Sequence, residues 1–130
     1  MNKAKLGGDL HELIKDAALD TEHLNHYKIS LGIVLDEIQT LCHEAELQGW
    51  ELGTFKQILA ELHLSLPRVV DLIRNARLVL EDGIREENWR YLDSSVLKMF
   101  RKYKKMPSDY WDDILTLSYT DLEIKINELS

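Results

Sequence analysis

Between residues 24 and 45, apolar side chains recur in alternating steps of three and four, a spacing that a helix gathers on one side. The stripe consists of Leu24, Tyr27, Leu31, Val34, Ile38, Leu41 and Ala45, and Leu35 and Cys42 widen it. This pattern predicts a helix of about 21–47. Because the spacing resembles a heptad repeat, the helix should carry a long packing seam. We expect this seam to pack inside the monomer, with packing against a second copy as the alternative.

Capping signatures and helical periodicity predict further helices on both sides of this segment. Asp9 followed by Glu12 indicates the start of a helix of about 9–19. Thr54 and Gln57 form a capping box before a short helix that ends near residue 63. The remaining helices are expected at about 66–80, capped by Ser65 and ended by Gly83, at 84–91, 95–105 and 108–117, and after a capping box of Thr120 and Glu123.

The composition agrees with a helical fold. Hydrophobic residues make up 45% of the 130 residues, which suits a globular domain, and only 6 glycines and 2 prolines leave little room for the turns of a β-sandwich. We therefore predict an all-α fold: a compact helical bundle of about six helices forming a single domain over 1–130, with a flexible start at 1–8.

Several classes of function lack their usual signals in this sequence. No run of 18 apolar residues predicts a membrane span, and the first residues lack the apolar core of a signal peptide, so we expect a cytoplasmic protein. Cys42 is the single cysteine and the histidines are not spaced as metal ligands, so we expect neither metal nor cofactor. Without a nucleophile elbow or a phosphate-binding glycine loop, we expect a protein that is not an enzyme.

The segment 54–80 has the proportions of a helix-turn-helix unit, with a short capped helix, a tight connection and a longer helix. The residues that carry the likeness are Trp50, Phe55, Leu59, Leu62, Leu64, Ser65, Val69, Ile73, Arg74 and Ala76. Over roughly 50–80, the chain resembles small helix-turn-helix proteins of phage and mobile-element type. Leu59 and His63 stand where such units usually have a small residue and a glycine.

The resemblance implies that the helix at 66–80 reads double-stranded DNA. At 100° per residue, Arg68, Arg74 and Asn75 should point away from its apolar face, together with Asp71. Arginine and asparagine are the side chains that pair with guanine and adenine edges. Arg77 falls near the apolar face, and we expect it to be a structural residue that is either snorkelling or ion-paired.

A second basic group lies further along the chain. Lys98, Arg101, Lys102 and Lys105 are spaced to share one face of the helix at 95–105. Because like charges on one face repel, an anionic counterpart is expected. It is either DNA phosphate or acidic surface of the same chain, such as Asp109, Asp112 and Asp113.

The net charge of −7, from 16 basic and 23 acidic residues, opposes general affinity for nucleic acid and supports an alternative function. In that alternative, the chain is a non-enzymatic protein–protein interaction module, such as a phage-type acidic inhibitor or adaptor of a larger nucleic-acid enzyme. An exposed Trp89 beside Arg90 would suit partner binding, whereas a buried Trp89 would fill a gap between helices. A homodimer is compatible with either function.

Overall fold

The structure, a computed structural model, describes residues 10–49 and 54–128, and within these ranges it describes side chains from residue 21 onward. All regular elements in these ranges are helical, which confirms the predicted all-α bundle. The elements in chain order are α2 (Leu10–Leu47), α3 (Phe55–Glu61), α4 (Leu66–Glu81), η1 (Glu86–Tyr91), α5 (Ser94–Tyr103), η2 (Pro107–Tyr110), α6 (Trp111–Thr116) and α7 (Tyr119–Glu128), where η marks a 3₁₀-helix.

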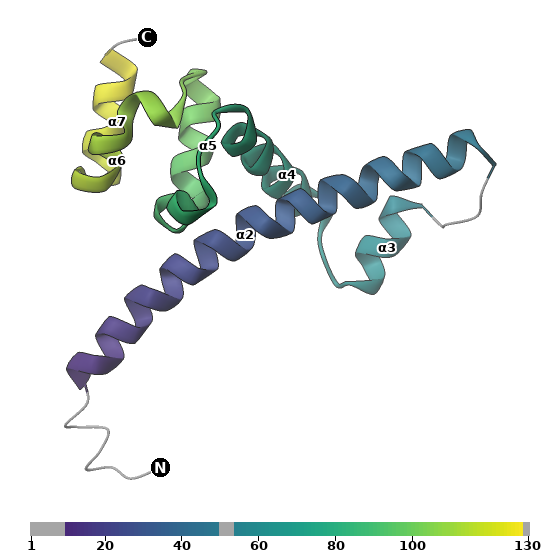
Figure 1. Cartoon of the computed structure of the whole chain (residues 1–130), viewed down its shortest axis with the longest axis horizontal. Coiled ribbons are helices and arrows are strands. Elements are labelled where there is room, and N and C mark those ends of the chain that lie inside the picture. The colour runs from purple at the N-terminus through teal and green to yellow at the C-terminus, as the bar shows by residue number, and fades with distance from the viewer. Residues whose placement is uncertain (1–9, 50–53, 129–130) are drawn as a thin grey trace.

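Helix α2 is the longest element, with 38 residues, and α3, α4 and η1 pack along it (Figure 1). The two helices predicted at 9–19 and 21–47 are wrong as separate elements, because they form this one helix. No glycine or proline stands between residues 9 and 31 to end the first helix. Gly49, at a φ of 75°, follows the end of α2 as expected for a helix terminus.

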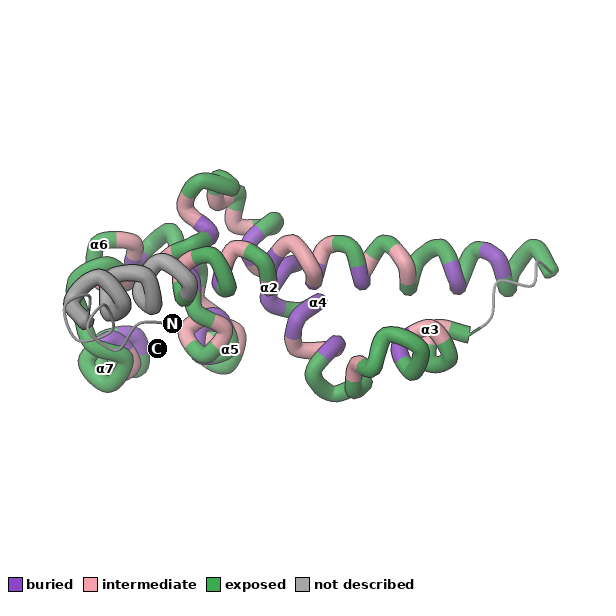
Figure 2. Tube along the Cα trace, turned by 90° about the horizontal axis from the view of Figure 1, so that it is seen from below, coloured by how far each residue is buried: buried purple, intermediate pink, exposed green. Residues whose placement is uncertain are grey.

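The helices are arranged in successive layers. Helix α4 packs against α2 on one side and against α5 on another, and α7 packs against α5 (Figure 1). Element η1 also lies on α2, and α3 lies beside the C-terminal half of α2 (Figures 1 and 2). Three apolar clusters follow from these contacts, one joining α2, α4, η1 and α5, one joining α2, α3 and α4, and one joining α5, η2 and α7.

Helices α2 and α4 approach each other closely at Gly32 of α2. A Cβ atom at this position would lie 2.3 Å from the carbonyl oxygen of Leu72 and 2.9 Å from the Cβ atom of Ala76, both on α4. Two small residues therefore allow the backbones of α2 and α4 to meet. Beside the crossing, Arg77 of α4 donates two hydrogen bonds to the carboxylate of Asp36 on α2, at 2.7 and 3.0 Å. Arg77 is thus ion-paired, one of the two predicted roles.

Most predicted helix boundaries lie close to the observed ones, and the differences have local causes. The Thr54 hydroxyl and the Gln57 side chain form the predicted capping box of α3. Ser65 occupies the capping position of α4 without a capping hydrogen bond from its side chain. The segment 84–91 is a 3₁₀-helix rather than an α-helix, and 108–117 divides into η2 and α6. The box at Thr120 is wrong, because Ser118 accepts the hydrogen bond from the amide of Asp121.

We predict that Gly32→Ala lowers the free energy of unfolding by about 1–3 kcal/mol, the usual cost of overpacking. Alanine favours a helix by about 1 kcal/mol over glycine, but the new methyl group would press on the backbone of α4. Urea denaturation followed by circular dichroism measures the change. Gln39→Ala, at an exposed position of the same helix, should alter stability by less than about 0.5 kcal/mol. A Gly32→Ala variant as stable as the wild type would contradict the close crossing.

The Asp36–Arg77 pair predicts a dependence of stability on pH. The hydrogen bonds from Arg77 lower the pKa of the Asp36 carboxyl, so the pair stabilises the fold above the ordinary aspartate pKa of about 3.9. Its contribution is lost as the pH falls through the lowered pKa. Because Arg77 is more than half exposed, we expect Asp36→Asn to cost at most about 1 kcal/mol at pH 7.

This difference between Asp36→Asn and the wild type should shrink as the pH is lowered below about 4. Urea denaturation at a series of pH values between 7 and 3 measures it. Glu37→Gln, at the adjacent exposed carboxylate, is the control and should change stability less at every pH. An equal cost of Asp36→Asn at neutral and acid pH would contradict the stabilising role of the ionised pair.

Candidate functional site

The apolar stripe of α2 is largely exposed. Four of its members have exposed fractions near one half: Leu24 47%, Tyr27 58%, Val34 48% and Leu41 56%. Leu31 and Ile38, between them, are partly buried, and only Ala45 at the C-terminal end is fully buried. The prediction that the seam packs inside the monomer is therefore wrong for most of its length. From here on, the α2 stripe means Leu24, Tyr27, Leu31, Val34, Ile38 and Leu41.

A different set of residues on α2 faces the domain. Asn25, Ile29 and Gly32 are buried, and at 100° per residue their mean direction lies about 130° from that of Leu24, Tyr27 and Leu31. Further along the helix the buried side turns towards α3 through Leu35 and Cys42 (Figure 2). Leu24 and Tyr27 thus point away from the core, whereas Leu31 packs against the cluster that contains Leu35.

Asn25 is a buried polar residue that the sequence did not single out. Its side-chain amide donates a hydrogen bond of 3.0 Å to the carbonyl oxygen of Arg90, which ties α2 to η1. Asparagine at a position that helical spacing places beside Ile29 is the signal that a polar contact lies inside the core. Its role is structural, since it satisfies a buried backbone group.

The basic face of α5 is partly paired with α4. Arg101, whose side chain is only 18% exposed, donates one hydrogen bond of 2.9 Å to the side-chain oxygen of Asn75 and one of 3.2 Å to the carboxylate of Asp71. Lys98 lies 4.0 Å from the same carboxylate. The expected anionic counterpart is therefore partly within the chain, but it is Asp71 rather than the acidic residues at 109–113. Of those, Asp113 pairs with Lys125 at 2.7 Å.

The three α4 residues predicted to read DNA do not share one exposed surface in the structure. Arg68 and Arg74 are exposed on α4, but Asn75 is 4% exposed, so its predicted outward orientation is wrong. Helix α4 is covered on two sides, and its second contact, with α5, turns Asn75 inward. Arg68 and Asn75 line one hollow together with Lys28 and Ser94, and Arg74 is not part of its lining.

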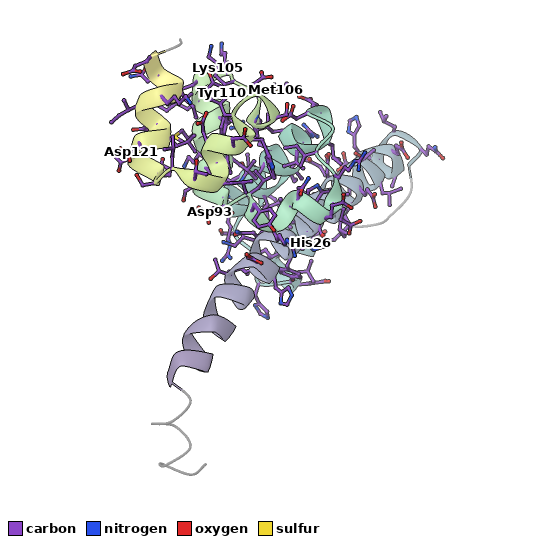
Figure 3. The ribbon with its side chains drawn as sticks, turned by 60° about the vertical axis from the view of Figure 1, so that its left-hand side comes forward. His26, Asp93, Lys105, Met106, Tyr110 and Asp121 are labelled. Carbon is purple, nitrogen blue, oxygen red and sulfur yellow. The ribbon has the colours of Figure 1, made fainter. Side chains whose placement is uncertain are left out.

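The two remaining lysines of the predicted basic face lie near the C-terminal end of α5. Lys102 is exposed, with its ammonium 5.2 Å from the centre of the Tyr103 ring. Lys105 follows the end of α5 and is partly buried. It lies beside Met106 at the top of Figure 3, well above His26. The four basic residues therefore do not form one uniform charged face, because Arg101 is withdrawn from it.

Trp89 is buried, with an exposed fraction of 8%, so it is not the exposed partner-binding residue that one of its two interpretations required. Its indole N–H donates a hydrogen bond of 3.0 Å to the carbonyl oxygen of Ile84, and the ring lies 5.4 Å from that of His26. Trp89 fills the gap between η1 and α2, the alternative reading of the sequence. Arg90 is exposed and stacks over the Tyr91 ring at 4.8 Å.

The hollow beside Trp89 is open and lined by charged and polar groups: His23, His26, Glu86, Glu87 and Arg90. His26 and Glu86 approach to 3.2 Å. Over residues 10–49 and 54–128, the histidine, cysteine and acidic side chains do not converge in any group suited to a metal ion. This hollow therefore holds a hydrogen-bonded histidine and glutamate rather than a set of metal ligands.

A second set of exposed apolar side chains lies on α6, α7 and the link between them. It comprises Leu115 at 49%, Leu117 at 36%, Tyr119 at 47% and Ile124 at 52%. These residues come from short elements, whereas the α2 stripe is a continuous row on one long helix. The α2 stripe is therefore the stronger candidate for a binding surface.

Comparisons with protein-family models, curated proteins and solved structures find no match to this chain. In the part of the chain that the structure describes, no helix combines the length and apolar character needed to cross a membrane. The surface geometry of the chain, above all the α2 stripe, is therefore the basis for a proposal about its function.

Proposed function

We propose that this chain is a protein–protein interaction module that binds through the α2 stripe. The observation that carries the proposal is a row of apolar side chains at heptad spacing on α2, in which Leu24, Tyr27, Val34 and Leu41 are about half exposed and Leu31 and Ile38 are partly buried. In water each of these side chains keeps apolar surface whose burial is favourable by about 25 cal/mol per Å². Scattered exposed apolar residues are ordinary, but a continuous helical row is typical of a surface that receives another helix.

The form of the stripe indicates what kind of partner fits. From Leu24 to Leu41 the row extends about 26 Å along the helix axis, at 1.5 Å per residue. Its members are spaced as the core positions of a coiled coil, which accept apolar side chains of a second helix between them. The proposal therefore specifies a helical partner surface with apolar residues at the same spacing.

The proposal predicts that photoreactive phenylalanine at position 34 or 41 forms discrete covalent adducts in cells that naturally produce the chain. The same residue at Arg85, whose side chain is 82% exposed, is the control and should give none. Adding Leu24→Glu to the chain labelled at position 34 should remove the adduct, because a buried charge opposes apolar packing. Gel mobility and mass spectrometry detect the adducts. Labelling that is absent, or equal at all three positions, would overturn this assignment of the stripe.

DNA binding is a second candidate, favoured by one observation. Arg68 and Arg74 remain exposed on α4, and α3, the turn and α4 follow one another in helix-turn-helix order. His63 adopts the left-handed conformation at the turn, with a φ of 57°, where such units usually have glycine. Against this candidate, Asp71 lies close to both arginines along the helix, and Asn75 and Arg101 are engaged with each other.

If α4 binds DNA, Arg68→Ala with Arg74→Ala should abolish salt-sensitive binding to a labelled random duplex without changing helicity. Each phosphate contact that is lost also reduces the slope of affinity against salt concentration. Fluorescence anisotropy at two salt concentrations measures binding, and circular dichroism measures helicity. Arg85→Ala with Arg90→Ala removes the same charge elsewhere and is the matched control. Absence of wild-type binding at low salt would exclude DNA as the direct ligand.

A further inference from the structure

We infer that the partner of the α2 stripe is the α2 stripe of a second copy of this chain, paired in the antiparallel direction. This inference rests on the proposed function and names its partner. It is argued from the order of the apolar residues along the helix, from the charges beside them, and from the side of α2 that the monomer leaves open.

The spacing of the stripe is the same in both directions along the helix. Its six members are separated by three, four, three, four and three residues. In an antiparallel pair, Leu24 therefore lies opposite Leu41 of the second copy, Tyr27 opposite Ile38, and Leu31 opposite Val34. Every apolar residue has an apolar counterpart in this register, as an interface with two-fold symmetry requires.

The residues on the two edges of the stripe favour antiparallel pairing of the two α2 helices over parallel pairing. One edge carries His23, Ser30, Glu37 and Glu44 at seven-residue spacing, one position before Leu24, Leu31, Ile38 and Ala45. His23, Glu37 and Glu44 are exposed. Antiparallel pairing places His23 near Glu44 of the second copy and Ser30 near Glu37. On this edge, the acidic C-terminal half of each helix therefore meets the N-terminal half of the other, which has no acidic residue there. In a parallel pair this edge would instead face the opposite edge of the second helix, where Leu35 and Cys42 are already buried in that copy's own core.

The monomer already fixes the side from which a second copy approaches. At the other edge of the stripe, Leu35 and Cys42 are buried in the chain's own core, with exposed fractions of 1% and 5%. At the edge with His23, Glu37 and Glu44, these three side chains stay exposed among the residues that the structure describes. The α2 helix of a second copy therefore packs over the row from this open edge. The opposite edge stays in contact with α3 and α4 of its own chain.

The first test is the mass of the full chain in solution, measured by sedimentation equilibrium over a range of concentrations. We expect twice the chain mass of 15.2 kDa for the wild type, and a single chain for Val34→Glu with Leu41→Glu. Leu115→Glu with Ile124→Glu makes the same chemical change on the α6–α7 set and should leave the dimer intact. A wild-type monomer at every concentration would overturn the inference, whether or not the variants fold.

The second test fixes the direction of pairing by disulfide formation in a Cys42→Ala background. Leu24→Cys and Leu41→Cys are prepared as separate chains, oxidised alone and as a mixture. In an antiparallel dimer the two cysteines of identical chains lie about 26 Å apart, far beyond the reach of a disulfide, so only the mixture should cross-link. Cross-linking of each variant alone would show the parallel direction and overturn the antiparallel arrangement.

These measurements separate the inference from the function on which it rests. Adducts from positions 34 and 41 that contain a different protein, together with a monomeric wild type, would overturn the second copy as partner and leave the interaction function standing. If stripe-dependent adducts are also absent, the interaction function fails as well. A dimer that persists with Val34→Glu and Leu41→Glu would place self-association on another surface and overturn the inference.

Discussion

The crossing of α2 and α4 at Gly32 is the contact on which the other packing depends. Because Gly32 has no side chain and Ala76 has only a methyl group, the two backbones meet closely enough for a Cβ atom to clash with a carbonyl oxygen. This approach brings Ile29 and Leu35 of α2 into separate apolar clusters on either side of the crossing. Another side of α4 packs against α5, and α5 in turn packs against α7. A larger residue at 32 would separate the first pair of helices and with it both clusters.

The same crossing explains why α2 has apolar residues on two sides. One set is needed to pack on α4, η1 and α3, and the α2 stripe is a second set that this packing uses only in part, through Leu31. Burial of long apolar side chains on only one side of a helix would suffice for a monomeric bundle. The second set is therefore the part of the sequence that the monomer fold does not fully account for, and self-pairing of α2 would account for it.

The all-α class and most helix positions could be predicted from the sequence because they depend on local signals. The Thr54–Gln57 box, Gly49 and Gly83 act within a few residues of themselves, and each lies at or near a helix terminus. The orientation of α2 could not be predicted, because Leu24 and Ile29 are equally apolar and only the position of α4 decides which is buried. Asn75 was misplaced for the same reason. Its burial depends on Arg101, a residue 26 positions away on another helix.

Helix α3 is held much less firmly than α4. It has seven residues, and Leu59 is its one buried side chain, whereas α4 buries six residues. Elements with few buried apolar contacts open at a lower free energy than the rest of a domain, so α3 should detach in local fluctuations that leave α2 and α4 together. Each such opening would remove Leu59 from the cluster around Leu35, which α4 would still contact, and would widen the apolar face of α2 towards its C-terminal end. The breadth of the surface offered to a partner is therefore set by a local unfolding equilibrium, and temperature or denaturant would enlarge it before the bundle melts.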